Sequence, residues 1–188
     1  MASSTIADVA AVLFDRDGTL IHDVPGNTDP DRVSPMPGAV RAVALARERG
    51  LAVGVVTNQA AVGNGVISLE DVDRVNERVD TLLGPFDVWE VCPHRAEDQC
   101  PCRKPRAGMV LSAARRIGVD PSRVVVIGDI GSDMGAAVSA GAPGILVPNS
   151  STRAEEIRAA PRVAPSLYDA VSLLVPPSGG TSSAGGAP

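Results

Sequence analysis

The stretch Val9-Ala10-Ala11-Val12-Leu13-Phe14-Asp15-Arg16-Asp17-Gly18-Thr19 decides how this chain folds. Its first six residues are apolar and favour a short buried strand, which ends in two carboxylates one residue apart and then a glycine. Where a strand gives way to a glycine-containing loop, acids at positions i and i+2 can converge on one small volume. Two anions held together are costly unless a cation or a chemical task compensates for them. The motif therefore indicates an active site, although Asp-Gly is also common in solvated turns.

Magnesium and phosphoryl chemistry would explain this pair of acids. Mg2+ prefers oxygen ligands and binds substrate phosphates, so it offsets the charge of Asp15 and Asp17. Asp15 could then attack phosphorus as a nucleophile, while Asp17 protonates the leaving oxygen and later activates water.

Strands alternate with helices along the rest of the chain. Short β-branched runs bounded by Gly or Pro predict strands at 9–14, 51–57, 86–91, 123–127 and 144–147. Helical patterns cover 37–49, 68–83, 107–117, 132–140, 151–160 and 166–175, the first starting at Pro37 and the second capped by Ser68. This alternation predicts an α/β fold with a mostly parallel sheet and helices on both faces.

Length and composition indicate a single domain with a hydrophobic core. The chain has 188 residues, of which 44% are hydrophobic and 2% aromatic, so its core consists of Val, Ala, Leu and Ile. We expect one domain over residues 1–175 and a disordered tail over 176–188, because the Pro, Gly and Ser of that tail have nothing to bury.

The composition also argues against several classes of partner. A net charge of −5 without a basic, aromatic-rich patch disfavours nucleic acid. No segment has the ~20 apolar residues that span a membrane. The N-terminus lacks the features of a signal peptide, so we expect a cytoplasmic protein. With few aromatics there is no obvious interface patch, and we expect a monomer.

Other predicted strands also end in polar groups. Thr57-Asn58-Gln59 follows the second strand, and Gly128-Asp129 follows the fourth, with Asp133 four residues later. In a parallel sheet these ends meet at one edge, where ligands bind. A hydroxyl and an amide can hold phosphoryl oxygens, and Asp129 can complete a Mg2+ site unless it is only a helix N-cap. Asp133 could merely orient its neighbours.

A cluster of metal ligands and cations precedes the helix at 107–117. Cys92, His94, Cys100 and Cys102 have the number and kind of ligands of a closed tetrahedral Zn2+ site, and unligated thiols are the alternative. A Cys100–Cys102 disulfide is disfavoured, because so short a ring is strained. Lys104 could neutralise a phosphoryl group, and the neighbouring Arg103 could grip its oxygens. His22 is expected to be a solvated loop residue.

Together these motifs resemble the haloacid dehalogenase (HAD) superfamily. The pattern Asp-x-Asp-Gly-Thr, Thr-Asn-Gln, Cys-x-His with Cys-x-Cys-Arg-Lys-Pro, and Gly-Asp-x-x-x-Asp covers about residues 9 to 148. It is similar to the capless, zinc-loop branch that contains heptose 1,7-bisphosphate 7-phosphatases and histidinol-phosphate phosphatase domains. The resemblance implies a three-layer Rossmann-like HAD fold with a zinc-binding loop and no cap domain. The short segments between the motifs, which leave no room for a cap, agree with it.

The resemblance also implies roles for single residues. Asp15 becomes the nucleophile, and Asp17 becomes the general acid and base. The Mg2+ ion is held by side chains of Asp15 and Asp129 and by the backbone carbonyl of Asp17. Thr57 and Asn58 fall on the phosphate-holding motif. Lys104 falls on the charge-balancing lysine, and Arg103 on a substrate contact.

The expected function is hydrolysis of a small sugar phosphate through an aspartyl phosphate, with heptose 1,7-bisphosphate favoured at its 7-phosphate. Histidinol phosphate is the competing substrate, and a non-catalytic zinc-stabilised binding module is the competing class. Two departures from the family pattern affect substrate contacts. The basic residue usual after Thr-Asn-Gln is missing from Ala60-Ala61-Val62-Gly63-Asn64-Gly65, and Ile130 replaces a polar residue after Gly-Asp.

Overall fold

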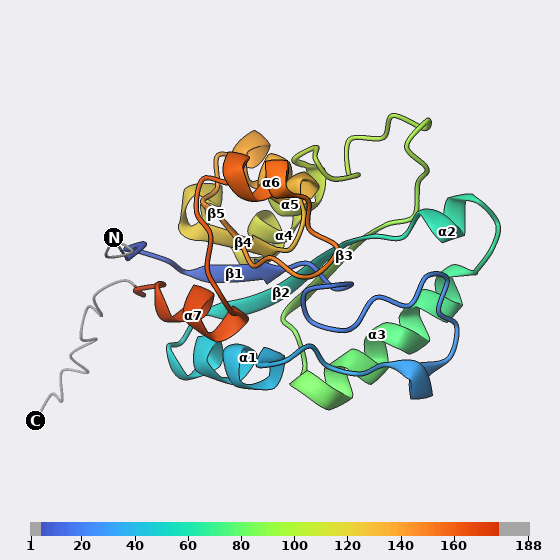
Figure 1. Cartoon of the computed structure of the whole chain (residues 1–188), viewed down its shortest axis with the longest axis horizontal. Coiled ribbons are helices and arrows are strands. Elements are labelled where there is room, and N and C mark those ends of the chain that lie inside the picture. The colour runs from blue at the N-terminus through green and yellow to red at the C-terminus, as the bar shows by residue number, and fades with distance from the viewer. Residues whose placement is uncertain (1–4, 177–188) are drawn as a thin grey trace, which may run out of the picture.

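A parallel five-stranded sheet forms the centre of the computed structural model, which describes residues 5–176 (Figure 1). The strand order is β3-β2-β1-β4-β5, with every neighbouring pair parallel. The strands are β1 (Ala11–Phe14), β2 (Ala52–Asn58), β3 (Val88–Cys92), β4 (Val124–Gly128) and β5 (Gly144–Leu146). All five predicted strands and the predicted α/β class are thus confirmed.

The helices follow the predicted alternation. They are α1 (Ala39–Glu48), α2 (Ala60–Gly63), α3 (Leu69–Leu83), α4 (Gly108–Ile117), α5 (Gly131–Ala140), α6 (Ala154–Ala159) and α7 (Leu167–Ser172), with 3-10 turns η1 (Pro30–Arg32) and η2 (Pro121–Arg123). Ser68 caps α3 as predicted, in a capping box with Asp71. The start predicted at Pro37 was wrong by two residues, because Gly38 adopts φ +83° and serves as the N-cap of α1. The one-turn helix α2 and both 3-10 turns were missed, since such short elements carry no periodic pattern.

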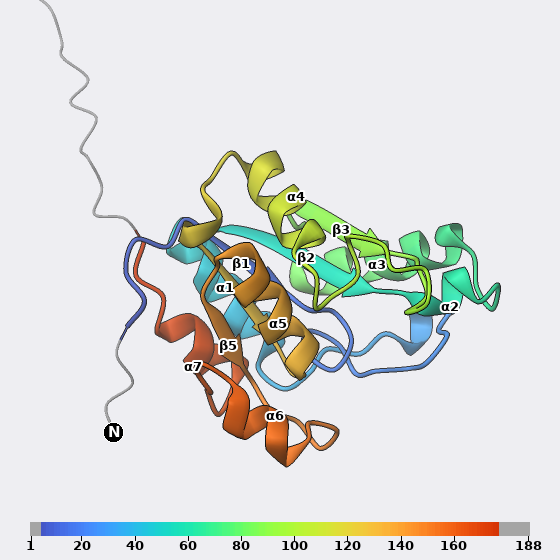
Figure 2. The ribbon, with the colours of Figure 1, turned by 90° about the horizontal axis from the view of Figure 1, so that it is seen from above.

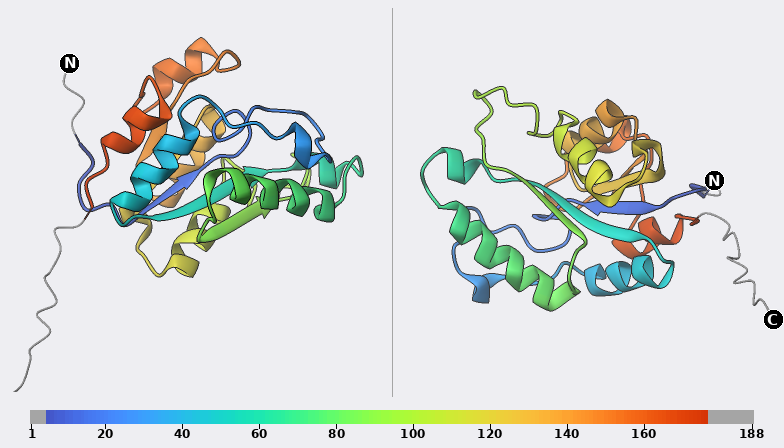
Figure 3. Two further views of the ribbon diagram at one scale, coloured as in Figure 1. Left: turned by 90° about the horizontal axis from the view of Figure 1, so that it is seen from below. Right: turned by 180° about the vertical axis from the view of Figure 1, so that it is seen from behind.

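Two hydrophobic cores lie on opposite faces of the sheet. Within β1, Val12 and Phe14 belong to one core, and Ala11 and Leu13 to the other. The first core is closed by α1, α3 and α7, and the second by α4 and α5. Figure 2 shows α4 and α5 over one face, and the two views of Figure 3 show α1 and α3 across the other. The central strands are therefore buried on both faces, and their carboxyl ends stay accessible at one edge.

The connections at this edge hold loops and short turns. Between β1 and α1 the chain forms a loop with the single turn η1, and between β3 and α4 it forms the cysteine-containing loop. Across residues 5–176 no inserted segment builds a cap, in agreement with the capless fold. No helix in that range is both long and apolar enough to cross a membrane. The tail predicted over 176–188 lies, apart from Pro176, outside the described residues.

Candidate active site

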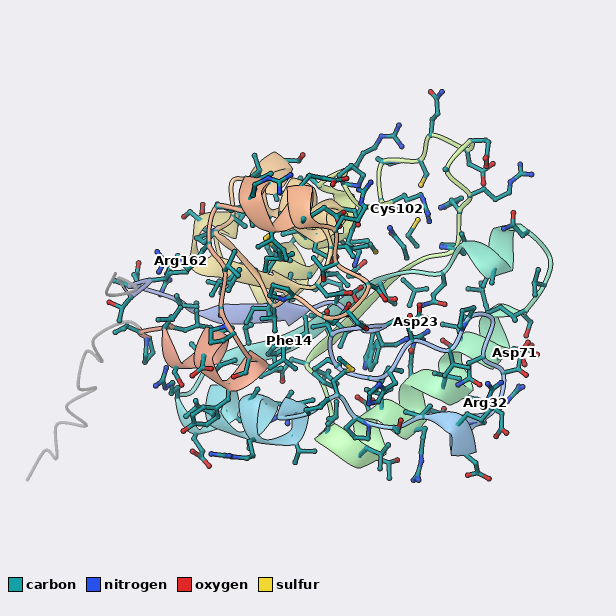
Figure 4. All side chains as sticks on the ribbon, in the orientation of Figure 1. Phe14, Asp23, Arg32, Asp71, Cys102 and Arg162 are labelled. Atoms are coloured by element: carbon teal, nitrogen blue, oxygen red, sulfur yellow. The ribbon has the colours of Figure 1, made fainter. Side chains whose placement is uncertain are left out.

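A cavity of about 260 Å3 opens at the carboxyl ends of β1 and β2. It brings together five residues predicted from the sequence, Asp15, Asp17, Thr57, Asn58 and Lys104. Its walls add Arg16, Asp23, Val24, Pro25, Gly26, Gln59, Ala60, Ala61, Ile130 and Ser132. Figure 4 shows Asp23 near this end of the sheet, on the same side as Cys102. The cavity therefore has a polar floor of strand-end residues and walls of mixed polar and apolar residues.

Lys104 lies at the centre of the floor. Its Nζ is 2.5 Å from Asp15 Oδ1 and 2.7 Å from Asp133 Oδ1, and it donates to the Val56 carbonyl at 2.8 Å. Burial alone would lower the pKa of Lys104, but attraction by Asp133 and Asp15 outweighs this and raises it. Burial raises the pKa of Asp15 well above its ordinary value despite Lys104, and the charges of Asp133 and Asp17 add to the rise. Lys104 is thus a fixed ammonium ion, but its charge alone does not fully compensate the negative charge of the neighbouring Asp15 carboxylate.

Asp129 follows directly on β4 and places a carboxylate oxygen within 4.8 Å of Asp15. Its carboxylate accepts from the Thr19 hydroxyl at 3.0 Å and from Asn149 Nδ2 at 2.8 Å. Gly18 packs directly against it, since a Cβ at that position would lie 2.6 Å from Asp129 Oδ2. Burial raises the pKa of Asp129, and Asp133 raises it further. The glycine of the opening motif is therefore required by a close approach as well as by its φ of +81°.

This floor fits a divalent cation. Asp15, Asp129 and Asp133 each offer an oxygen, and these atoms lie within 4.8 Å of one another. With the Lys104 ammonium, the three carboxylates leave a formal charge of −2, which one Mg2+ would balance. Asp133 is fully buried and already engaged by Lys104, whereas Asp15 borders the cavity. Asp15 and Asp129 are thus the better placed ligands, and Asp133 holds the lysine.

The Asp17 carboxylate points to a different set of partners. Arg16 donates to it through Nε and Nη2, and Gln59 Nε2 donates to it at 2.7 Å. Gln59 Nε2 also donates to Thr57 Oγ1 at 2.9 Å. Because the Thr57 hydroxyl accepts this bond, its own proton is free to bind a phosphoryl oxygen.

Asn58 and Arg103 differ from the simplest expectation for substrate contacts. The Asn58 amide lines the cavity, but it exchanges hydrogen bonds with the Lys104 backbone, accepting at 3.1 Å and donating at 3.2 Å. Arg103 is half-buried and donates to the His94 carbonyl at 3.2 Å, and it is not among the cavity-lining residues. Asn58 is therefore placed to fix Lys104, and Arg103 would have to swing inward to reach a ligand.

The four predicted zinc ligands form one cluster. Cys102 Sγ lies 3.3 Å from Cys92 Sγ, Cys100 Sγ and His94 Nδ1, and Cys92 Sγ lies 3.6 Å from Cys100 Sγ and His94 Nδ1. A tetrahedral Zn2+ with bonds of about 2.0–2.3 Å requires ligand separations of roughly 3.3–3.8 Å. The sulfurs are far beyond disulfide distance, and all three cysteines are free. Burial followed by the neighbouring thiols raises the pKa of Cys102 to about 12. A cation that displaces thiol protons therefore suits the cluster.

The cysteine loop contacts the cavity wall directly. The Gln59 backbone N–H donates to the Cys92 carbonyl at 2.7 Å, and the Gly63 N–H donates to the Pro93 carbonyl at 2.8 Å. A Cβ at Gly63 would lie 2.7 Å from that Pro93 oxygen. The cysteine loop is thus hydrogen-bonded both to Gln59 and to α2.

Four contributors to the site were not assigned from the sequence: Arg16, Gln59, Asn149 and the lysine-holding role of Asp133. Gln59 and Asp133 lie within motifs that were recognised, but nothing in the spacing shows which partner each one meets. Asn149 follows β5, so the rule that strand ends gather at one edge could have found it. His22 is exposed, as expected.

Comparison with known proteins agrees with this fold. The family model described as "HAD-hyrolase-like" matches residues 101–170. A D-glycero-beta-D-manno-heptose-1,7-bisphosphate 7-phosphatase of Bordetella bronchiseptica is 31% identical over 147 residues, which are 76% of this chain and 82% of the relative. The corresponding D-glycero-alpha enzyme of Mycobacterium bovis is 35% identical over 130 residues, 65% of this chain and 68% of the relative.

A solved structure gives the same result. The D,D-heptose 1,7-bisphosphate phosphatase of B. bronchiseptica, complexed with magnesium and phosphate, superposes with a TM-score of 0.76 at 28% identity. The match covers 86% of this chain and 96% of that one. A parallel sheet with acids at its strand ends is the arrangement of a HAD-type hydrolase. The chain belongs to this superfamily and, within it, to the heptose 1,7-bisphosphate 7-phosphatase family.

Proposed function

We propose that this protein is a Mg2+-dependent phosphatase that hydrolyses a small sugar phosphate through an aspartyl phosphate on Asp15. The observation that carries the proposal is the buried Lys104 ammonium between Asp15 and Asp133, with an Asp129 oxygen within 4.8 Å of both acids. The relatives act on heptose 1,7-bisphosphate, and we take its 7-phosphate as the favoured target. The domain would comprise residues 1–175, followed by the tail 176–188.

The first step transfers the phosphoryl group to the protein. Mg2+, held by the Asp15 and Asp129 side chains and the Asp17 backbone carbonyl, would neutralise the phosphate when bound. An Asp15 oxygen forms a bond to phosphorus while the bond between phosphorus and the sugar oxygen breaks. Asp17 gives its proton to that sugar oxygen, so the sugar leaves as an alcohol. Thr57 and Lys104 hold the phosphoryl oxygens, and Asn58 keeps the lysine in place.

The second step restores the protein. Asp17, now ionised, accepts a proton from water as that water attacks phosphorus. The bond between Asp15 and phosphorus breaks, and inorganic phosphate leaves. One proton thus passes from Asp17 to the sugar and is replaced from water, which leaves the protein unchanged after each cycle.

We further propose that Cys92, His94, Cys100 and Cys102 bind a structural Zn2+. Support comes from the 3.3–3.6 Å spacing of these ligand atoms and from a ligand set that leaves no open position. Arg103, which follows the last ligand, would contact the substrate. We expect about one zinc per purified chain. Cys102→Ser should lose the metal, so a zinc chelator should leave its melting temperature unchanged. The same chelator should lower the melting temperature of the parent protein. A zinc-free parent that is insensitive to chelation would contradict the site.

Asp15→Asn tests the enzyme proposal. An amide cannot form the aspartyl phosphate, so phosphate release should fall to the rate without protein. Asp120→Asn is the matched control, because Asp120 is an exposed acid that caps η2 on the surface, and it should keep parental activity. If Asp15→Asn hydrolyses phosphate esters at the parental rate, the mechanism is wrong.

A substrate panel separates the alternatives. It should contain both anomers of heptose 1,7-bisphosphate and histidinol phosphate, compared by kcat/KM. Histidinol phosphate is the second candidate because Ile130 lines the cavity where the family pattern commonly has a polar or basic residue, and Asn64 stands where that pattern usually has a basic one. A parent that binds phosphorylated sugars without releasing phosphate would instead be the zinc-stabilised binding module.

A further inference from the structure

The Asp17 carboxylate accepts hydrogen bonds from three nitrogen atoms, two of Arg16 and one of Gln59. Arg16 Nε lies 3.2 Å from both Asp17 oxygens, and Arg16 Nη2 lies 3.0 Å from Oδ2. Gln59 Nε2 adds a bond of 2.7 Å to the same Oδ2. The Asp17 side chain keeps 25% exposure, whereas that of Arg16 keeps 5%. The carboxylate is thus gripped from its protein side while it still borders the cavity.

Arg16 is in turn anchored on α3, which lies beside the loop that follows β1 (Figure 1). Its Nη1 donates to Asn76 Oδ1 at 2.7 Å, across 60 residues of sequence. Asn76 is 6% exposed, and its neighbours on the buried face of α3 are Val72, Val75 and Val79. A polar residue on this face is costly unless it has a partner, and the guanidinium is that partner. The buried arginine therefore has a fixed geometry at both ends of its fork.

Gln59 supplies a second link. Its single Nε2 bridges Asp17 Oδ2 and Thr57 Oγ1, at 2.7 and 2.9 Å. The Gln59 backbone N–H is bound to Cys92 at the start of the cysteine loop. The position of the Asp17 carboxylate is thereby tied to β2 and to the cysteine loop as well as to α3.

We propose that Arg16 and Gln59 are positioning residues that fix the Asp17 carboxylate for proton transfer to the leaving group, and that Asn76 sets the position of Arg16. The inference rests on the role proposed for Asp17. General acid catalysis contributes typically 10²–10⁴-fold, and a carboxylate that rotates freely loses part of that factor. Removal of the Asn76 acceptor should therefore weaken the step in which the sugar oxygen needs a proton.

The leaving group distinguishes positioning from general damage. A sugar alkoxide needs a proton to leave, whereas p-nitrophenolate is stable without one. Asn76→Leu removes the acceptor at similar size, and Asn76→Asp keeps an acceptor for Arg16. We expect Asn76→Leu to lower kcat/KM for a sugar phosphate by about 10–100-fold and for p-nitrophenyl phosphate by less than about 3-fold. Asn76→Asp should restore most of the loss, and Gln59→Met should repeat the selective loss.

Val79→Ala is the structural control. It removes apolar contacts on the same buried face of α3 and should lower the melting temperature without changing the ratio of the two kcat/KM values. If Asn76→Leu lowers kcat/KM equally for the sugar phosphate and for p-nitrophenyl phosphate, or lowers it for neither, the inference is overturned.

Crystal structures provide a readout that does not depend on turnover. Asp17 should keep its bonds to Arg16 and Gln59 in the parent, and its carboxylate should be displaced or spread over two positions in Asn76→Leu. An unmoved carboxylate in Asn76→Leu would overturn the inference even if the parent proved inactive. Inactivity of the parent on every phosphate ester would instead count against the proposed function.

Discussion

Replacement of Lys104 by Met should destabilise the protein more than the removal of a charged side chain from the surface does. The Nζ atom contacts Asp15 at 2.5 Å and Asp133 at 2.7 Å, and the lysine side chain is 2% exposed. Met fills a similar volume but leaves two buried carboxylates without their cation. Loss of one partner from a buried ion pair costs about 3–5 kcal/mol. In a domain of this size that corresponds to a fall in melting temperature of about 6–20 °C.

Thermal and urea unfolding of the metal-free protein at pH 7 would measure this loss. Arg74→Met is the matched control, because Arg74 pairs with Asp71 on the exposed side of α3, and we expect it to cost less than about 1 kcal/mol. The double variant Lys104→Met/Asp133→Asn should be more stable than Lys104→Met alone, since it removes one of the orphaned charges. A Lys104→Met protein no less stable than Arg74→Met would refute the view that the ammonium balances these acids.

Three further outcomes follow from the charges of the site. Burial raises the folded-state pKa of Asp15 and Asp129 above the ordinary 3.8, so on acidification the folded state binds protons before the unfolded state does. The stability of the metal-free protein should therefore rise as pH falls from 7 towards that ordinary value. A melting temperature that falls over this pH range, measured in chelator, would contradict this. Mg2+ at about 100 times its Kd should raise the free energy of unfolding of the parent by about 2.7 kcal/mol and thereby its melting temperature. Asp129→Asn should lose most of this shift in the same titration. Among the described residues, the two cationic side chains in the cavity lining, Arg16 and Lys104, are already paired with carboxylates, so neither is available to bind a second phosphate. The kcat/KM for heptose 7-phosphate should therefore lie within about 10-fold of the value for the 1,7-bisphosphate. A preference for the bisphosphate above about 100-fold would show that another group binds its second phosphate.

The strand positions could be read from the sequence because the buried parallel strands are short, mostly apolar runs bounded by turn residues. The same logic located Asp15, Thr57 and Asp129, since ligands gather where parallel strands end. The contact between Lys104 and Asp133 could not be read in this way. It depends on how deeply Asp133 is buried under Gly128, where a Cβ would lie 2.3 Å from the Asp133 carboxyl carbon.

Side-chain direction accounts for the other omissions. Arg16 lies between the two acids of the opening motif, yet its partner Asn76 is on a helix whose packing angle is set by apolar residues. The sequence also assigns Asn58 to phosphate, whereas its amide is occupied by the Lys104 backbone. Whether Asn58 contacts a phosphate as well remains a prediction, as does the substrate contact of Arg103.

The contacts that build the active site join distant parts of the chain. Lys104 and Asp15 are 89 residues apart, Thr19 and Asp129 are 110 apart, and Asn149 reaches Gly18 across 131 residues. A fragment that ends before Asn149 lacks the bonds that Asn149 donates to Gly18 and Asp129, although Thr19 still contacts Asp129. Magnesium affinity would therefore report how far folding has advanced: a nascent or truncated chain should bind the metal more weakly until the segment after its fifth strand has reached the site.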